Sequence, residues 1–258
     1  MIGEKISIIT VSFNSEKTIE NTFQSVLNQK YRPLEYIIVD GKSTDGTIKI
    51  IKKYLPIFLA AGIEVNYKSE KDKGISDAFN KGIARATGDI IGIINSDDCI
   101  AENILCTIAE KFSETDDVLC GDCLWRDVKK NSQYVRKSQM KLKKLKHEMV
   151  LMHPTCFVRK KAYETYGVFD INLKFCMDKD LMARFYRKGV KFKYIPQIIA
   201  IMSAGGTSDV NYRGVFDEGQ VVALRNGVPY FCAVIYKYYK IIRIKLVKYY
   251  QKTKKIDY

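Results

Sequence analysis

The chain has 258 residues, of which 47% are hydrophobic and 28% are charged. This composition excludes wholesale disorder, and the length fits one large α/β domain or a domain with a small appendage. The 43 Lys and Arg residues exceed the 29 Asp and Glu residues, and the net charge of +14 predicts a negatively charged partner: phosphate groups, an anionic membrane surface or nucleic acid.

The first hundred residues alternate between strand and helix patterns. Short apolar runs rich in β-branched residues predict buried strands at residues 6–12, 34–39, 65–67 and 89–94. Apolar residues at helical spacing predict helices at residues 19–27, 48–59 and 74–86. This order predicts an α/β fold with a Rossmann-like, mostly parallel central sheet that carries helices on both faces.

The second half is less regular. Residues 129–146 hold eight Lys and Arg and no acidic residue, which is typical of a solvated surface loop or helix. A strand over 155–158, a helix over 160–166, a helix after Asp178 and two β-like runs flanking Pro196 are expected to follow. No run of 18 uncharged apolar residues occurs, so no membrane span is predicted. Seven scattered cysteines, an odd number, predict reduced thiols in a cytosolic protein.

Polar clusters follow three of the predicted strands, at Phe13-Asn14, at Asp40–Asp45 and at Asn95–Asp98. Ligands of open α/β sheets bind in the crevice outside the carboxyl ends of the strands. Because all three clusters stand at that edge, the sequence predicts a single site there.

Five motifs in this order resemble the family 2 nucleotide-sugar glycosyltransferases, which have the GT-A fold. The motifs are Ser7–Asn14, Ile38–Thr47, Asp72–Gly82, Asn95–Asp98 and Met177–Leu181. The resemblance covers about residues 4–210. It implies a GT-A catalytic domain over 1–210, with a donor-binding half (1–100) and an acceptor and catalytic half (101–210). The residues after this domain, 211–258, predict a basic extension of amphipathic C-terminal helices.

The resemblance implies inverting transfer of a sugar from a nucleotide-sugar donor to a hydroxyl group. In the family, the last Asp of the acidic motif holds Mn²⁺ or Mg²⁺, and here that residue is Asp98. Asp97 would accept hydrogen bonds from the ribose hydroxyls, and Asn95 stands where the family has a further Asp. Asp97 and Asp98 could instead be an N-terminal cap pair for the next helix.

The nucleotide-binding residues follow from the same resemblance. Asp40 resembles the aspartate that accepts from the uracil N–H, although an ordinary turn aspartate is the alternative. The first strand and its loop contribute Thr10, Val11, Phe13 and Asn14.

A segment that closes over the donor would contribute four more residues, which are Asp72, Gly74, Asp77 and Asn80. Asp77 could equally cap its own helix.

Inversion requires a base on the face opposite the leaving group. The resemblance assigns this role to Asp178, although Met177 replaces the Glu that precedes this Asp in the family. Asp180 is the alternative base. His153 could contact a phosphate, the metal or the acceptor, or it could be structural. Gly205–Ser208 could form a flap near the phosphates or a plain loop.

No Gln-x-x-Arg-Trp motif is present, which favours a single addition over processive polymerisation. We therefore expect a metal-dependent hexosyltransferase that uses a UDP-sugar and a lipid-linked or cell-surface glycan acceptor, in O-antigen, capsule or exopolysaccharide assembly. The alternatives are a nucleotidyltransferase on the same sheet and a basic nucleic-acid-binding module. Acidic strand ends would repel nucleic acid, so no nucleic-acid partner is expected.

The segment from Pro229 to Tyr258 predicts a helix with an apolar, tyrosine-rich face and basic flanks. That face comprises Ile235, Tyr238, Tyr239, Ile242, Leu246, Tyr249 and Tyr250. Such a helix suits the interface of an anionic membrane, which would place a cytoplasmic enzyme on the inner face of the cell membrane. The alternative is that the face packs on the catalytic domain or on a second subunit in a homodimer.

Overall fold

The computed structural model describes residues 3–127, 130–203 and 211–253, with only the backbone described for Tyr212 and for 248–253. The strands are β1 (Ile6–Ser12), β2 (Leu34–Asp40), β3 (Glu64–Ser69), β4 (Ile90–Ile93), β5 (Cys99–Ile100), β6 (Val118–Asp127), β7 (Ser132–Arg136), β8 (Phe157–Arg159) and β9 (Phe192–Ser203). The α-helices are α1 (Ile19–Leu27), α2 (Thr47–Ala60), α3 (Ile75–Arg85), α4 (Ile104–Lys111), α5 (Lys160–Tyr166), α6 (Met177–Arg187), α8 (Tyr212–Arg225) and α9 (Tyr230–Thr253).

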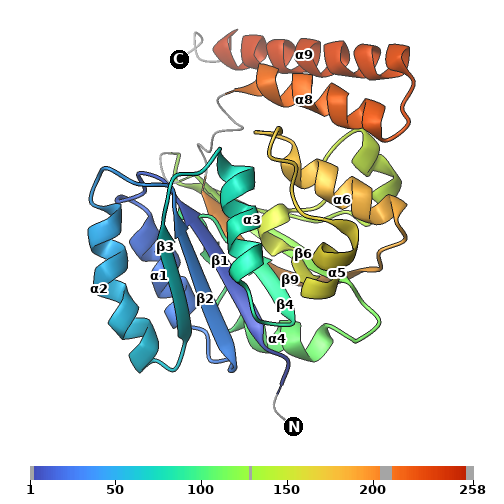
Figure 1. Cartoon of the computed structure of the whole chain (residues 1–258). Helices are drawn as coiled ribbons and strands as arrows, with labels where there is room; N and C mark the ends of the chain where they lie inside the picture. Colours follow the sequence, from blue (N-terminus) through green and yellow to red (C-terminus); the bar gives the residue numbers. More distant parts are fainter. Residues whose placement is uncertain (1–2, 128–129, 204–210, 254–258) are drawn as a thin grey trace.

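Across these ranges the strands form one sheet in the order β3-β2-β1-β4-β8-β6-β9-β5, with β7 paired to β6 (Figure 1). The first four strands in this order are parallel to one another. All residues of β1 and β2 are buried, as expected for strands covered on both faces. The mostly parallel sheet that the sequence predicts is therefore confirmed.

Two hydrophobic cores lie on opposite faces of the sheet. One contains apolar side chains of α3, α5 and α6, and the other contains those of α1, α2 and α4. In β1 the alternation of side chains sends Ile9 into the first core and Ile8 into the second. The helices of both layers are visible in Figure 1.

The second half of the sheet mixes strand directions. β8 runs antiparallel to β4 and β6, whereas β6 and β9 run parallel to each other. Instead of the two β-like runs predicted around Pro196, β9 is one strand whose pairing with β6 shifts register near that proline. Part of the basic segment 129–146 is the exposed strand β7, and Leu142–Lys146 is a 3₁₀ helix, so the expected loop or helix is only partly right.

The sheet has a topological switch point between β1 and β4. β1 lies between β2 and β4, and the loops that leave β1 and β4 are adjacent. The hydroxyl groups of Ser15 and Ser96 are 2.8 Å apart and join these two loops by a hydrogen bond. This is the position at which open α/β sheets bind their ligands.

The two last helices, α8 and α9, form a pair on the side of the molecule toward which β1 and β2 end (Figure 1). Tyr236 of α9 donates to Glu148 at 3.0 Å, and Lys240 pairs with the same carboxylate at 2.9 Å. Lys237 pairs with Asp217 of α8 at 2.5 Å. These contacts attach α9 both to α8 and to the segment that carries Glu148.

Among the described residues, no helix combines the length and the apolar character needed to cross a membrane. The predicted domain boundary at residue 210 and the glycine-rich stretch Gly205–Ser208 lie outside the described residues.

Candidate active site

Asp97 and Asp98 follow β4 at the switch point. Asp98 is 3% exposed. Its carboxylate accepts from the Asn95 amide at 3.1 Å and from the Ser203 backbone N–H at 3.3 Å. Burial, assisted by the neighbouring charge of Asp97, raises the pKa of Asp98 to about 7. Burial also raises the pKa of Asp97.

The two carboxylates have no cationic partner within the described ranges. The Oδ1 atom of Asn95 is buried and lacks a hydrogen-bond partner. The carboxylate groups of Asp97 and Asp98 and the Oδ1 atom of Asn95 offer oxygen ligands, which Mn²⁺ and Mg²⁺ prefer. No described cluster of three His, Cys, Asp or Glu side chains offers another metal site. The chemistry of these residues therefore fits a divalent cation, which Asp98 would hold with Asp97 and Asn95 beside it.

Asp40, at the end of β2, is fully buried. Its Oδ1 atom accepts from the hydroxyls of Ser12 at 3.1 Å and Ser43 at 2.5 Å. Its Oδ2 atom accepts from the Ser43 backbone N–H at 3.1 Å and from the Ser69 hydroxyl at 2.7 Å. The carboxylate thus joins the ends of β1, β2 and β3, and the predicted contact of Asp40 with uracil stays a prediction.

Asp72 lies against the backbone of Gly41. A Cβ atom on Gly41 would be 2.5 Å from Oδ2 of Asp72 and 3.4 Å from the Phe13 ring. The other oxygen of Asp72 accepts from the Gly74 backbone N–H at 2.9 Å. Phe13 is 64% exposed, so an exposed aromatic ring and a carboxylate oxygen meet over a residue without a side chain.

The other residues predicted in the first strand and its loop have structural partners. Asn14 has a positive φ of 51°, and its side chain accepts from the Thr44 N–H at 2.8 Å. Thr10 accepts from the hydroxyl of Tyr36, and both Thr10 and Val11 are buried. The structure therefore brings Phe13 and Asn14 to the open edge and keeps the Thr10 and Val11 side chains in the interior.

The start of α3 joins the loops at the strand ends to the second half of the chain. Asp77 accepts from the Lys73 N–H at 3.0 Å and pairs with Lys81 at 3.3 Å, so it joins the residue before the Gly74 N-cap to the first turns of α3. The Asn80 side chain exchanges two hydrogen bonds of 2.9 Å with the backbone of Phe169. Contacts of Asp77 and Asn80 with the donor stay predictions.

His153 and Asp178 lie near each other beneath this region. Burial lowers the pKa of His153, and the charge of Asp178 opposes that effect, so the imidazole is predominantly neutral at pH 7. Its ring packs against Phe79 and Phe169, with centroids 5.9 and 5.6 Å away. Asp178 is half-buried in the first turn of α6 and has no described ion-pair partner. The predicted contact of His153 with a metal is untested.

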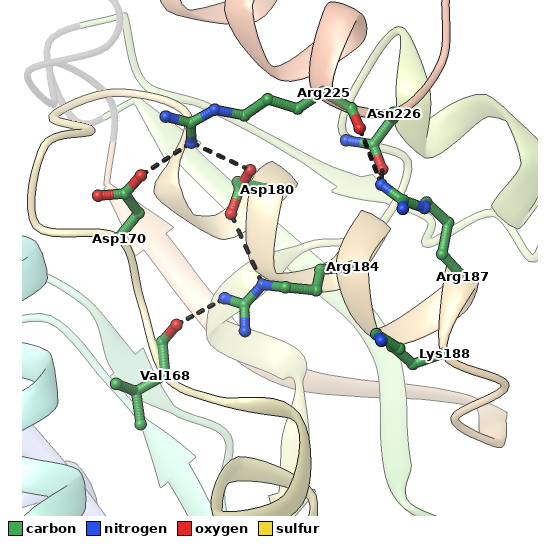
Figure 2. A pocket seen from close by; sticks show the side chains of 8 residues that line it. All are labelled: Val168, Asp170, Asp180, Arg184, Arg187, Lys188, Arg225 and Asn226. Carbon is green, nitrogen blue, oxygen red and sulfur yellow. Dashed lines mark hydrogen bonds and ion pairs between the residues drawn. The ribbon is translucent and has the colours of Figure 1, made fainter.

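Asp180 lies on a different face of α6 and is engaged in ion pairs. Figure 2 shows it between Arg184 and Arg225. Its carboxylate oxygens lie 3.9 Å from Nε of Arg184 and 3.6 Å from Nη1 of Arg225, and all three residues line a cavity of about 400 Å³. Arg225 also pairs with Asp170 at 2.8 Å. These ion pairs connect α6 to the end of α8, which is a structural use of the Asp180 charge.

The serines that donate to the Asp40 carboxylate are not among the site residues that the motifs predict. Ser12 and Ser43 flank this aspartate within the quoted motifs, and Ser69 is its register partner on β3. Ser69 is the last residue of β3, so the alignment of the strand ends was the signal that could have found it.

Residues 7–167 match the model of the family described as "Glycosyl transferase family 2". The chain belongs to this family. The match covers the strand-end motifs described above, and it favours glycosyl transfer over nucleotidyl transfer and nucleic-acid binding.

The sequence of a curated relative aligns with that of this family 2 glycosyltransferase over almost the whole chain. A PGL/p-HBAD biosynthesis glycosyltransferase of Mycobacterium bovis is 23% identical over 252 residues, which are 96% of each chain.

Solved structures confirm the fold. S. aureus TarS 1–349 in complex with UDP has a TM-score of 0.64 and 22% identity, over 89% of this chain and 68% of that chain. The mannosyltransferase PcManGT from Pyrobaculum calidifontis in complex with GDP-Man and Mn²⁺ has a TM-score of 0.67 and 17% identity, over 92% of this chain and 70% of that chain. Both likenesses support the GT-A fold that the motifs predict.

The burial of Asp98 predicts a stability cost that Asp98→Asn removes. Its folded-state pKa of about 7 exceeds the value of about 3.9 expected in the unfolded chain, so the native protein loses stability as pH rises from about 4 to about 7. In metal-free buffer, Asp98→Asn should therefore raise Tm more at pH 8 than at pH 5. Thermal unfolding followed by circular dichroism measures both differences.

Added Mn²⁺ provides the control for this prediction. It should raise the Tm of the native protein at pH 8 and leave the Tm of Asp98→Asn unchanged. An equal response of both proteins to Mn²⁺, or a variant that is less stable than the native protein at pH 8, would contradict this role of Asp98.

Proposed function

We propose that this family 2 glycosyltransferase moves a single sugar from a UDP-sugar to a hydroxyl group of a lipid-linked or cell-surface glycan, with inversion at the anomeric carbon. The observation that carries the proposal is the desolvated pair Asp97 and Asp98 at the switch point, which lacks a described cationic partner. Such a pair suits a ligand that brings phosphate groups together with a cation.

Asp98 would hold Mn²⁺ or Mg²⁺, with Asn95 and Asp97 beside it. When bound, such a cation neutralises charge that develops on the leaving diphosphate. Asp97 accepts from the ribose hydroxyls. The complex of PcManGT with GDP-Man and Mn²⁺ supports a donor and a metal of this class.

Asp72 and Phe13 suit the nucleobase. Asp40 is the residue that the motifs predict for the contact with uracil, but four hydrogen bonds within the protein already occupy its carboxylate. We therefore propose Asp72 for that contact and assign to Asp40 the ordering of the strand ends. Asp72 offers a carboxylate oxygen over Gly41, where it can accept from the uracil N3–H, and the exposed Phe13 ring can stack on the base. The UDP complex of TarS supports a uridine donor.

Asp72→Asn should weaken UDP binding about 10-fold or more, because a hydrogen bond to a charged acceptor contributes roughly 1.5–3 kcal/mol. Isothermal titration calorimetry with UDP in the presence of Mn²⁺ measures the effect. Glu70→Gln is the matched control, since Glu70 lies in the same segment and pairs with Arg85 at 3.0 Å. If the two variants bind UDP equally well, Asp72 does not contact the base.

Asp178 would act as the general base. Its carboxylate takes the proton of the acceptor hydroxyl as that oxygen attacks the anomeric carbon, while the bond between the sugar and the diphosphate oxygen breaks. The position of Asp178 in the first turn of α6 and its lack of a described ion pair support this role. The ion pairs of Asp180 support a structural role for that residue.

Asp178→Asn should lower kcat for hydrolysis or transfer of the UDP-sugar by roughly 10²-fold or more and leave KM for the donor nearly unchanged. Asp180→Asn should instead lower Tm, because Arg184 and Arg225 lose their shared partner. Steady-state kinetics with a panel of nucleotide sugars and Mn²⁺ measures the first effect, and thermal unfolding measures the second. A large loss of kcat in Asp180→Asn alone would reverse the assignment.

An anionic membrane surface is the proposed partner of α9. The outer face of this helix comprises Phe231, Ile235, Tyr238, Tyr239, Ile242 and Leu246, and all six side chains are exposed. This face includes all the predicted membrane-facing residues except Tyr249 and Tyr250, whose side chains lie outside the description.

The environment of the outer face favours a membrane over packing on the catalytic unit. Tyr236, Lys237 and Lys240 make polar contacts with the rest of the chain, and Ala233 packs against Ala223 and Val228. The residues of the outer face have no such contacts in the described part of the chain. Arg243 and Lys245 are exposed beside it, so cationic groups border an apolar surface. A lipid-linked acceptor would be presented at such a surface.

The full chain should sediment with vesicles of phosphatidylglycerol and phosphatidylcholine, less so with phosphatidylcholine alone and less at high salt. The double variant Phe231→Glu with Ile235→Glu should stay in the supernatant. Leu59→Glu is the matched control, because Leu59 is similarly exposed but lies on α2. A native chain that binds neither vesicle at any salt concentration would contradict the membrane role and favour contact with a second subunit.

A further inference from the structure

The segment before α6 ends in three successive backbone N–H groups that point to one carboxylate. Glu218 of α8 accepts from the N–H groups of Lys174 at 2.8 Å, Phe175 at 2.7 Å and Cys176 at 2.9 Å. Cys176 is the N-cap residue of α6 and makes no side-chain cap of its own. Glu218 therefore supplies, from another helix, an anionic acceptor for the N–H of the N-cap residue and for the two N–H groups before it.

The face of α8 that carries Glu218 is shaped to approach this segment. A Cβ atom on Gly214 would lie 2.5 Å from the Phe175 ring, so only glycine allows the helix to come this close. Lys179 donates to the carbonyl of Gly219 at 2.9 Å, and Val222 packs with Cys176. These positions recur one turn apart on α8, so one face of the helix covers the start of α6.

The same segment also contacts the donor side of the site. Ser76 in the first turn of α3 donates to the carbonyl of Leu173 at 2.7 Å. Residues 173–176 are thus held from one side by α3, next to Asp72, and from the other side by Glu218. Asp178 follows this segment by two residues, and its backbone position depends on where the segment lies.

We propose that Glu218 is a positioning residue for the general base, so that α8 orients the start of α6 through this side chain as well as forming the connection to α9. The inference rests on the proposed role of Asp178. By fixing three N–H groups, the Glu218 carboxylate fixes the origin of α6 and the direction from which Asp178 meets the acceptor hydroxyl. A displacement of about 1 Å at such a group costs up to roughly 10²-fold in rate.

Glu218→Gln tests this role. The amide keeps one acceptor oxygen and turns its NH₂ group toward an N–H, so part of the cap is lost while the size of the side chain is kept. We expect kcat for UDP-sugar hydrolysis with Mn²⁺ to fall about 10- to 100-fold, with KM for the donor within about twofold of the native value. Amide hydrogen exchange at residues 174–176 should accelerate.

Asp217→Asn is the matched control. Asp217 precedes Glu218 on α8, and its carboxylate pairs with Lys237 of α9 and not with the segment before α6. This variant should keep the native kcat, KM and exchange at 174–176. If Glu218→Gln does not fold, Glu218→Asp replaces it, because it keeps the charge and shortens the side chain by one methylene, and the same split between kcat and KM is expected.

The two readouts separate the inference from the proposed function. A native chain that hydrolyses no nucleotide sugar would overturn the proposed function and with it the positioning role, whatever the exchange shows. An active native chain whose kcat survives Glu218→Gln would overturn only the positioning role. Unchanged exchange at 174–176 in Glu218→Gln would show that Glu218 does not hold these three N–H groups, and it would overturn the positioning role as well.

Discussion

Asp98 carries a carboxylate that the fold removes from water and surrounds with an amide, a backbone N–H and a second carboxylate. Such a group destabilises the protein when no cation is bound to it, because burial disfavours the charged form of the carboxylate. Its position depends on the placement of β1 beside β4 at the switch point, where the bond between Ser15 and Ser96 joins the two loops. The proposed cation and the diphosphate of the donor would supply the missing charge and ligands.

The remaining polar groups hold the loops around this carboxylate. Asp40 gathers the ends of three strands through Ser12, Ser43 and Ser69, and this arrangement brings Gly41 beneath Asp72. From there the contacts continue through α3 to the segment before α6 and on to α8. The helix pair is thus joined to the donor side by hydrogen bonds and close packing, which links the surface proposed to meet the membrane to the groups proposed to act on the acceptor.

Much of this arrangement can be predicted from the sequence, since buried parallel strands consist of apolar runs and the strand ends carry the polar motifs. The limits have physical causes. β6 is difficult to predict because Gly121, Asp122 and Arg126 interrupt its apolar pattern, and its pairing with β9 is irregular. The burial of Asp40 depends on hydroxyl groups from β1, from β3 and from the loop that follows β2. Glu218 lies about 40 residues from the segment that it caps, and only the tertiary fold brings the two together.

The central claim is that Asp98 binds the donor through a divalent cation. Isothermal titration calorimetry of UDP with the native chain and with Asp98→Asn, each with Mn²⁺ and with chelator, tests it most directly. The account predicts that the native chain binds UDP at least ~10-fold more tightly with Mn²⁺ than with chelator, and that Asp98→Asn shows no such difference, since Asp98 would hold the cation that neutralises the diphosphate. Equal affinity of the native chain for UDP with and without the metal would contradict the account.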